Sequence, residues 1–294
     1  MTKEVETEEI IEKPKKHIFI KLIIFILIII VLVIFYGRYI GTKGLITKEY
    51  RIESDILTSN FNGFKIVHFS DLLYKSTIVS EDVDNLVESI NILKPDIVVF
   101  TGDLTSNKNK ITSDDINILK DKLKSIEAKI AKYAIYGDYD YNLDEYESIM
   151  EYADFKILNN SYDEIYYKES NPIYIVGLPS SQKAKIDLNK AFDFYNEENR
   201  TFTVVLTHNG NTIKYLDEST YEVDLILGGH SLGGNINIHG IKELFIDSSS
   251  YKYYDSHYRK GITNIYISSG LGTKKYDYRL FNKPSFNLYR LKAN

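Results

Sequence analysis

The sequence of 294 residues contains no cysteine. This absence excludes a disulfide framework, a thiolate metal site and a cysteine nucleophile. Any metal ion would therefore be held by His, Asp, Glu or Asn side chains. Apolar residues, by contrast, are plentiful: they make up 44% of the chain, which is enough for a packed core and excludes disorder for most of it.

Beyond its N-terminal part the chain has fewer basic than acidic residues. Residues 50–294 contain 28 Lys and Arg against 35 Asp and Glu, a net charge of −7. An acidic domain binds a phosphate backbone poorly, so nucleic acid is not an expected partner.

The longest apolar run covers residues 18–36, in which Lys21 is the one charged residue. As a helix this run would span roughly 28 Å, about the thickness of a hydrocarbon core. A buried core helix rarely contains so unbroken a run. A cleaved signal peptide is also disfavoured, because no A-x-A-like cleavage site follows. The sequence therefore predicts an uncleaved transmembrane anchor at 18–36, which makes the lipid bilayer a partner of the chain.

The charges beside this run predict its orientation. The basic residues that precede or enter it are Lys13, Lys15, Lys16 and Lys21, and those that follow are Arg38, Lys43 and Lys48. This bias favours a cytoplasmic N-terminus. The expected arrangement is a single-pass protein of the cell membrane, with a cytoplasmic tail at 1–17, a tether at 37–47 and an extracytoplasmic domain at 48–294.

Strand and helix patterns alternate from about residue 48 onward. Buried strands are expected at 65–69, 97–100, 134–136, 173–176, 202–206, 223–227, 264–268 and 286–290. Amphipathic helices are expected at 83–93 and 116–130. With no internal repeat and no long linker, the pattern indicates one α/β domain whose second half is rich in strands.

Polar and glycine-rich clusters follow five apolar runs of the sequence. They occupy residues 70–73, 101–104, 137–141, 207–209 and 228–234. Taken singly, an Asp at a strand end is more often a turn or helix cap than a ligand, and a lone His208 is more often a core histidine. Five in series predict a site at the carboxyl ends of the strands, where α/β sheets bind their ligands.

These clusters resemble the motifs of the calcineurin-like metallophosphoesterases, in particular those of the bacterial membrane-anchored branch. The family motifs read D-x-H, G-D, G-N-H-D/E, H and G-H-x-H, in this order and at similar gaps. The flanking segments KPDIVVFTGDL, GGHSLGG and LFNKPSFNLYRL match as well, so that the resemblance covers roughly residues 48–294. It implies a four-layer α-β-β-α sandwich, here preceded by the transmembrane helix, with a two-metal site between the strand ends.

The chain departs from the family pattern at four positions. Leu73 and Leu232 replace metal-binding histidines, Tyr139 replaces the catalytic histidine, and Asp138 replaces an asparagine ligand. In the family, the first metal would use positions 71, 73, 103 and 232. The two lost metal-binding histidines both belong to that metal.

The ligands of the second metal are all retained, as Asp103, Asp138, His208 and His230. Two carboxylates and two neutral imidazoles suit Mn, Fe or Zn better than Ca. We therefore expect one divalent ion at these four residues, with Asp71 as a weak further ligand. The alternative is that Leu73 and Leu232 pack as an apolar plug over a dead site, or beside a live second site.

The same departures predict impaired catalysis. Two ions jointly activate water and neutralise phosphoryl oxygens. A single ion cannot contact the attacking and the leaving oxygen in the same way. Tyr139, with a reference pKa of ~10, is a poor proton donor at neutral pH. Loss of a general acid typically costs ~10²–10⁴-fold in rate. Asp71, freed from a metal, is a candidate base.

Three functions remain open at this point. The favoured one is a non-catalytic binder of a phosphorylated lipid or envelope ligand, or of a protein, at the membrane. The second is a weak or remodelled phosphoesterase that uses one metal. The third is an envelope structural protein that uses the fold as a scaffold and binds no metal.

Overall fold

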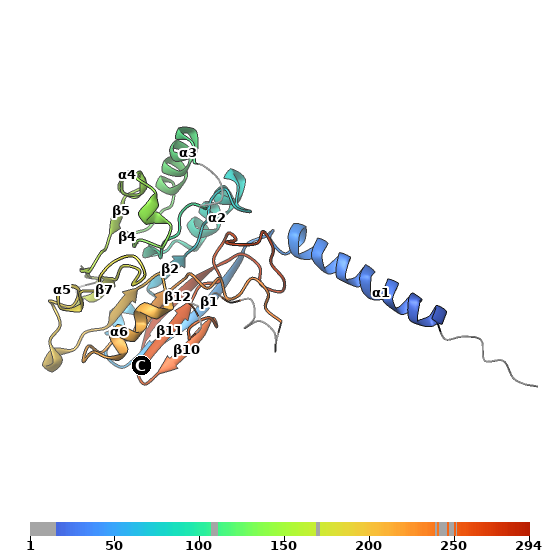
Figure 1. The fold of residues 1–294 in the computed structure, drawn as a ribbon. Helices are drawn as coiled ribbons and strands as arrows, with labels where there is room; N and C mark the ends of the chain where they lie inside the picture. Colours follow the sequence, from blue (N-terminus) through green and yellow to red (C-terminus); the bar gives the residue numbers. More distant parts are fainter. Residues whose placement is uncertain are drawn as a thin grey trace, which may run out of the picture.

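Two six-stranded sheets, packed face to face, form the domain that follows the N-terminal helix (Figure 1). The structure is a computed structural model that describes residues 16–106, 111–168, 171–238, 240, 246, 250 and 252–294. Of the cytoplasmic tail expected at 1–17, residues 1–15 lie outside the described residues.

The first sheet has the order β1-β12-β2-β3-β4-β5. Its strands are β1 (Ile46–Ser54), β12 (Ser285–Ala293), β2 (Lys65–Phe69), β3 (Ile97–Phe100), β4 (Ala131–Ala134) and β5 (Phe155–Ile157). The strands from β2 to β5 are parallel, whereas β12 is antiparallel to β2. The turns that follow β2, β3 and β4 therefore lie at one edge of the sheet.

The second sheet has the order β10-β11-β9-β8-β7-β6. Its strands are β10 (His257–Lys260), β11 (Thr263–Ile267), β9 (Leu225–Gly228), β8 (Thr203–Leu206), β7 (Ile173–Gly177) and β6 (Ser161–Ile165). Four of them, β7, β8, β9 and β11, are parallel, and the two outer strands are antiparallel to their neighbours.

Helices cover the outer face of each sheet. The first sheet packs against α2 (Ser80–Leu93), α3 (Ser113–Lys124) and α4 (Tyr146–Tyr152), and the second against α5 (Leu188–Ala191) and α6 (Ile213–Asp217). Single 3₁₀ turns occur at Ser59–Phe61, Asp140–Asn142, Glu197–Asn199 and Gly210–Thr212.

Alternation along each strand divides the apolar side chains between the layers. In β3, Val98 and Phe100 face the helices while Ile97 and Val99 face the other sheet. In β8, Val204 and Leu206 likewise enter the core between the sheets. The predicted four-layer α-β-β-α sandwich is confirmed.

Most of the expected elements are present with ends that differ by up to three residues, and the bounds of two of them are wrong for a structural reason. The strand expected at 134–136 is β4 at Ala131–Ala134, and the chain leaves the sheet there to bring Gly137 against Gly102. The helix expected at 116–130 ends at Lys124. Ile126 lies in the turn after the helix but is buried in the same core as Leu119 and Leu123. Its position therefore extends the apolar spacing beyond the end of the helix.

The N-terminal apolar run forms α1 (Lys16–Phe35), which extends away from the domain (Figure 1) and exposes its apolar side chains. It continues into one π-helical turn at Tyr36–Ile40. The helical stretch Ile18–Ile40 is long and apolar enough to cross a membrane.

The end of this helical stretch contacts the chain segment just before β12. The backbone N–H of Arg279 donates to the carbonyl oxygen of Gly37 at 2.9 Å, and the Tyr278 hydroxyl donates to that of Val33 at 3.2 Å. A Cβ on Gly41 would lie 1.9 Å from the Arg279 carbonyl oxygen. Gly37 and Gly41 therefore allow close backbone approach between the N-terminal helix and the domain.

Substituting Gly41→Ala is expected to separate the anchor from this segment, because the added methyl group would overlap the Arg279 carbonyl. In detergent-solubilised protein, hydrogen exchange at the Arg279 amide should become faster. Gly44→Ala is the control: a Cβ there would meet only the Lys283 Nζ at 3.7 Å, although φ is +83°. Equal protection of the Arg279 amide in wild type and Gly41→Ala would contradict the contact.

Candidate metal centre

The ends of β3, β8 and β9 bring three of the predicted ligands together. Ligand atoms of Asp103, His208 and His230 all lie within 4.8 Å of one another, and all three side chains are buried. Each residue directly follows an apolar strand or is separated from it by a short turn. The packing of the two sheets thus creates the cluster from segments far apart in the sequence.

Asp138, on the turn after β4, completes the predicted set of four. Its Oδ2 lies 3.0 Å from His230 Nδ1, and its Oδ1 accepts a hydrogen bond from the Ser180 hydroxyl. Asp71, after β2, lies on the other side of the cluster, where its Oδ2 accepts the backbone N–H of His230 at 2.9 Å.

The orientation of His208 leaves one ring nitrogen for the cluster. Its Nδ1 lies 2.7 Å from the Thr101 carbonyl oxygen, so it is the donor, and Nε2 lies 3.2 Å from Asp103 Oδ2. His230 Nδ1 lies 3.4 Å from the same Nε2. A backbone carbonyl that fixes the tautomer of a histidine is the usual support of a metal ligand.

Carboxylates control the charge of the cluster. Burial alone would lower the pKa of His208, but Asp103 raises it to about 9. Burial alone would raise the pKa of Asp138, but hydrogen bonding to His230 and the charges of the two histidines lower it to about 2. The cluster is therefore anionic in its carboxylates and protonated on His208, a proton that a bound cation would displace.

The backbone of the site is left-handed at non-glycine positions. Asp71, Leu73, Asp103, His230 and Leu232 all have φ between 48° and 67°. Such conformations cost free energy and tend to persist at functional sites. The two leucines keep the conformation of the ligand loops although they cannot coordinate a metal.

Asp140 ties the loops after β3 and β4 together. Its carboxylate accepts the backbone N–H groups of Asp103, Leu104 and Gly137 at 2.7–2.8 Å. Burial, with the nearby Asp103 charge, raises the pKa of Asp140 to about 7. Asp140 therefore positions Asp103 without contacting the histidines itself.

Leu73 and Leu232 are buried beneath the segment that follows β11. A Cβ on Gly270 would lie 2.5 Å from Leu232 Cδ2, and a Cβ on Gly272 would lie 2.6 Å from Leu73 Cβ. These glycines let the chain pass directly over both leucines. The lost ligand positions are thus apolar and closely packed.

Tyr139 lies beside the cluster and is half-buried. Its backbone N–H donates to Asp103 Oδ1 at 2.8 Å, and burial raises the pKa of its phenol further from neutrality. The hydroxyl is therefore a poorer proton donor than the histidine it replaces.

Sequence reasoning missed Lys274, whose ammonium group enters the site. Its Nζ lies 3.2 Å from Asp71 Oδ1, 3.1 Å from Asp103 Oδ2 and 2.9 Å from the His230 carbonyl oxygen. Burial alone would lower its pKa, but Asp103 and Asp71 raise it above its usual range. A signal was present: the glycine-rich residues 268–274 follow an apolar strand, as the five recognised clusters do.

The donor atoms fit a divalent cation. Asp103 Oδ2 is buried and faces the Nε2 of His208 on one side and the Nζ of Lys274 on another. Asp103 and the two histidines converge there and Asp138 lies against His230, which gives a mixed oxygen and nitrogen set that suits Mn, Fe or Zn. The residues present therefore fit the group that the sequence resemblance implies.

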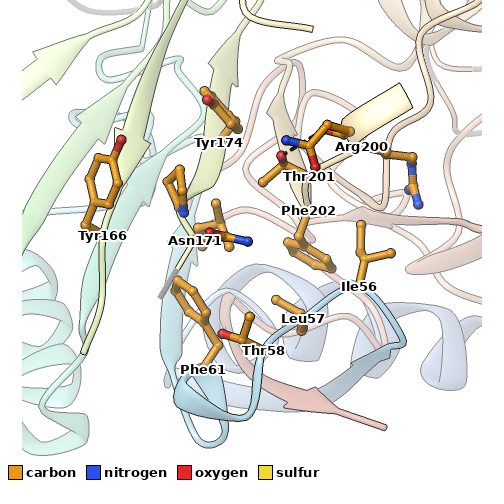
Figure 2. Close-up of a pocket in the computed structure, with 13 residues that line it drawn as sticks. Ile56, Leu57, Thr58, Phe61, Tyr166, Asn171, Tyr174, Arg200, Thr201 and Phe202 are labelled. Atoms are coloured by element: carbon orange, nitrogen blue, oxygen red, sulfur yellow. Dashed lines mark hydrogen bonds between the residues drawn. The ribbon is translucent and has the colours of Figure 1, made fainter. Parts of the chain in front are cut away.

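A hollow of about 230 Å³ lies at the opposite ends of the strands (Figure 2). It is lined by residues that precede β7 and β8 and by the turn near Phe61. Its Arg200 is already paired with Glu222 and Asp224. Among the described residues that line it, this hollow therefore offers no free cation to a phosphate group.

Comparison with known proteins gives one family. The family model for calcineurin-like phosphoesterases matches residues 64–234. The chain is 29% identical over 261 residues to the uncharacterized metallophosphoesterase YkuE of Bacillus subtilis, covering 88% of this chain and 89% of that protein.

Two further relatives are informative. A transmembrane protein with metallophosphoesterase domain from Danio rerio is 22% identical over 222 residues, 71% of this chain and 49% of its own. The UDP-2,3-diacylglucosamine pyrophosphatase LpxG of Chlamydia muridarum is 26% identical over 226 residues, 61% of this chain and 67% of its own.

Gly102→Ala is expected to disrupt the site, because a Cβ there would lie 2.2 Å from the Gly137 backbone nitrogen and φ is +91°. The loops after β3 and β4 would have to separate. We therefore expect the free energy of unfolding to fall by more than ~3 kcal/mol. Gly63→Ala is the control: φ is +81° but nothing lies within 4 Å. It should cost only ~1 kcal/mol. Chemical denaturation measures both, and equal losses would refute the close approach.

Proposed function

The chain belongs to the calcineurin-like phosphoesterase family, and on that basis we propose that it binds phosphorylated ligands at a single metal ion without turning them over. The convergence of Asp103, Asp138, His208 and His230 carries this proposal. These are the four donors of one family metal position. At the other position, two of the four donors are leucines.

The metal would be held by these four side chains. Asp71 would be a weak ligand, because its carboxylate already contacts Ser70, the His230 backbone and Lys274. A divalent ion supplies a Lewis acid that polarises a phosphoryl oxygen. The protein contributes the fixed tautomer of His208 and the buried carboxylate of Asp103. Mn, Fe and Zn are the ions that this donor set favours.

Hydrolysis would lack two of its usual contributions. The half-buried Tyr139 holds its proton more tightly than a free tyrosine, so protonation of a leaving group is slow. Asp71, the candidate base, accepts hydrogen bonds from Ser70 and from the His230 backbone and faces Lys274. Its carboxylate is engaged in positioning, which supports binding more than proton transfer.

The proposed location is the outer face of the cell membrane. The N-terminal apolar helix supports a single membrane pass, and the lysines at its start favour a cytoplasmic N-terminus. The anchor ends on the segment containing Tyr278 and Arg279, a few residues from Lys274. The site would therefore lie close to the membrane surface, within reach of lipid and envelope phosphates.

The relatives support the ligand class. LpxG is named as a pyrophosphatase of a diacylglucosamine nucleotide, which is a phosphorylated lipid. We therefore place phosphorylated lipid or envelope intermediates first among the ligands of this chain.

A weak one-metal phosphoesterase is the second candidate. The ammonium group of Lys274 beside Asp103 favours it, because this cation retains some positive charge at the position where the first metal is lost. The two functions differ in turnover and share the metal.

Titration of the full chain with Mn²⁺ in detergent should give about one equivalent, since one complete donor set is present. His208→Ala should abolish this binding, because it removes the nitrogen that faces Asp103. His257→Ala is the matched control: this histidine is exposed on β10 and outside the donor set. Mn²⁺ binding that survives His208→Ala would overturn the assignment.

Turnover separates the two candidate functions. Mn²⁺-loaded protein should bind inorganic phosphate, and His208→Ala should lose this binding, because phosphate would be held at the metal. Hydrolysis of bis(4-nitrophenyl) phosphate should not rise above the level measured with a chelator. Turnover that depends on Mn²⁺ and disappears in His208→Ala, but not in His257→Ala, would establish the weak phosphoesterase instead.

A further inference from the structure

We propose that the ammonium group of Lys274 stands permanently in the place of the family's first metal ion, so that the site pairs one metal with one built-in cation. The inference deepens the proposed function and rests on its assignment of a single metal. Lys274 Nζ lies between Asp71 Oδ1, at 3.2 Å, and Asp103 Oδ2, at 3.1 Å. These are the two carboxylates that the first metal would use.

The surroundings hold the ammonium on several sides. Its Nζ also lies 2.9 Å from the carbonyl oxygen of His230 and 3.1 Å from Nδ1 of that residue, so that the ammonium directly borders the donor set of the retained metal. The ring of Tyr139 covers it, with the ring centroid 5.6 Å away. The side chain is 14% exposed, whereas the next residue, Lys275, is exposed. This lysine is therefore part of the site, unlike its neighbour.

The two leucines are explained by the same replacement. A metal ion at this position would need the imidazoles that Leu73 and Leu232 have replaced. A lysine needs the opposite: carboxylates at its tip and apolar packing along its stem. Both leucines are buried and pack against the segment that leads to Lys274, through Gly272 and Gly270.

A buried arginine fixes that segment. The guanidinium of Arg279 is fully buried and donates to the carbonyl oxygens of Gly272, Ser269 and Asn282. The amide of Asn282 in turn donates to the Leu232 carbonyl oxygen at 2.6 Å. The loop that delivers Lys274 is thus bound to the loop that carries His230, which limits how far the lysine can move.

Charge balance fits one metal plus one ammonium. Three carboxylates face the centre, those of Asp71, Asp103 and Asp138. A divalent cation and the ammonium together neutralise them while both imidazoles remain neutral ligands. A phosphoryl group would meet the metal on one side and the ammonium on the other, so the ligand class is a compound that carries a phosphate group.

The test counts the metal ions that ligand restoration adds. Leu73→His/Leu232→His restores the family ligands but leaves Lys274, so it should bind the same number of Mn²⁺ ions as wild type. Adding Lys274→Ala should raise that number by about one. Adding Lys275→Ala to the same double variant is the matched control and should leave it unchanged. Mn²⁺ electron paramagnetic resonance should show a spin-coupled pair only with Lys274→Ala.

The outcome is read relative to wild type, which keeps it separate from the proposed function. If wild type binds no metal, the proposed single-metal function fails, but the difference between the double and triple variants still tests Lys274. An additional ion in the double variant, with Lys274 intact, would overturn the inference. So would a triple variant that gains none while folding normally.

A second measurement uses the wild-type protein and therefore does not depend on whether a variant folds. Lysine labelling by reductive methylation, read by mass spectrometry, should modify Lys275 quickly and Lys274 slowly. Saturation with Mn²⁺ should leave Lys274 protected, because metal and ammonium occupy different positions. If Mn²⁺ makes Lys274 as reactive as Lys275, the metal expels the lysine and the inference is wrong.

Discussion

Burying the carboxylates of Asp71, Asp103 and Asp138 where the two sheets meet requires positive charge beside them, because unpaired buried anions cost several kcal/mol each. In this chain the protein itself supplies part of that charge through Lys274. On the side of Asp138, His208 and His230 the positive charge is a proton on His208, which a bound cation would displace. This constraint therefore divides the site into one half that Lys274 occupies and one half that can bind a metal ion.

The same constraint connects the site to the N-terminal apolar helix. Lys274 is effective only if its loop is held in place, and Arg279 holds it by donating to three backbone carbonyls. The backbone N–H of Arg279 then donates to Gly37, at the end of the apolar helix. Site, loop and N-terminal apolar helix therefore form one continuous set of contacts.

Much of the fold followed from local patterns, because buried parallel strands are short apolar runs that a sequence displays directly. The strands β2 and β3 have the predicted bounds. The edge strands β5, β6 and β10 were not predicted, since one face of each is exposed and their residues do not form an apolar run. The end of β4 was misplaced because Tyr136, which looks like strand, packs on aromatic rings outside the sheet.

The site was predictable to a similar degree. Rules about strand ends placed Asp71, Asp103, His208 and His230 together, and the structure brings them together. Lys274 was missed because family motifs direct attention to residues that match or fail to match a pattern. A compensating residue from a separate loop belongs to no such pattern, and its role is visible only from the oxygens that surround it.

An ammonium group is an incomplete substitute for a metal ion, and the difference indicates which function survives. It carries one positive charge and donates hydrogen bonds, so it can hold a phosphoryl oxygen as a lysine does in many phosphate sites. It has no vacant coordination position, so it cannot bind water and lower its pKa as a divalent ion does. Replacing the first metal by Lys274 therefore preserves attraction for a phosphate group while removing part of the activation of water. Together with Tyr139 in place of a proton-donating histidine, this favours a site that retains binding of phosphorylated ligands more fully than their hydrolysis.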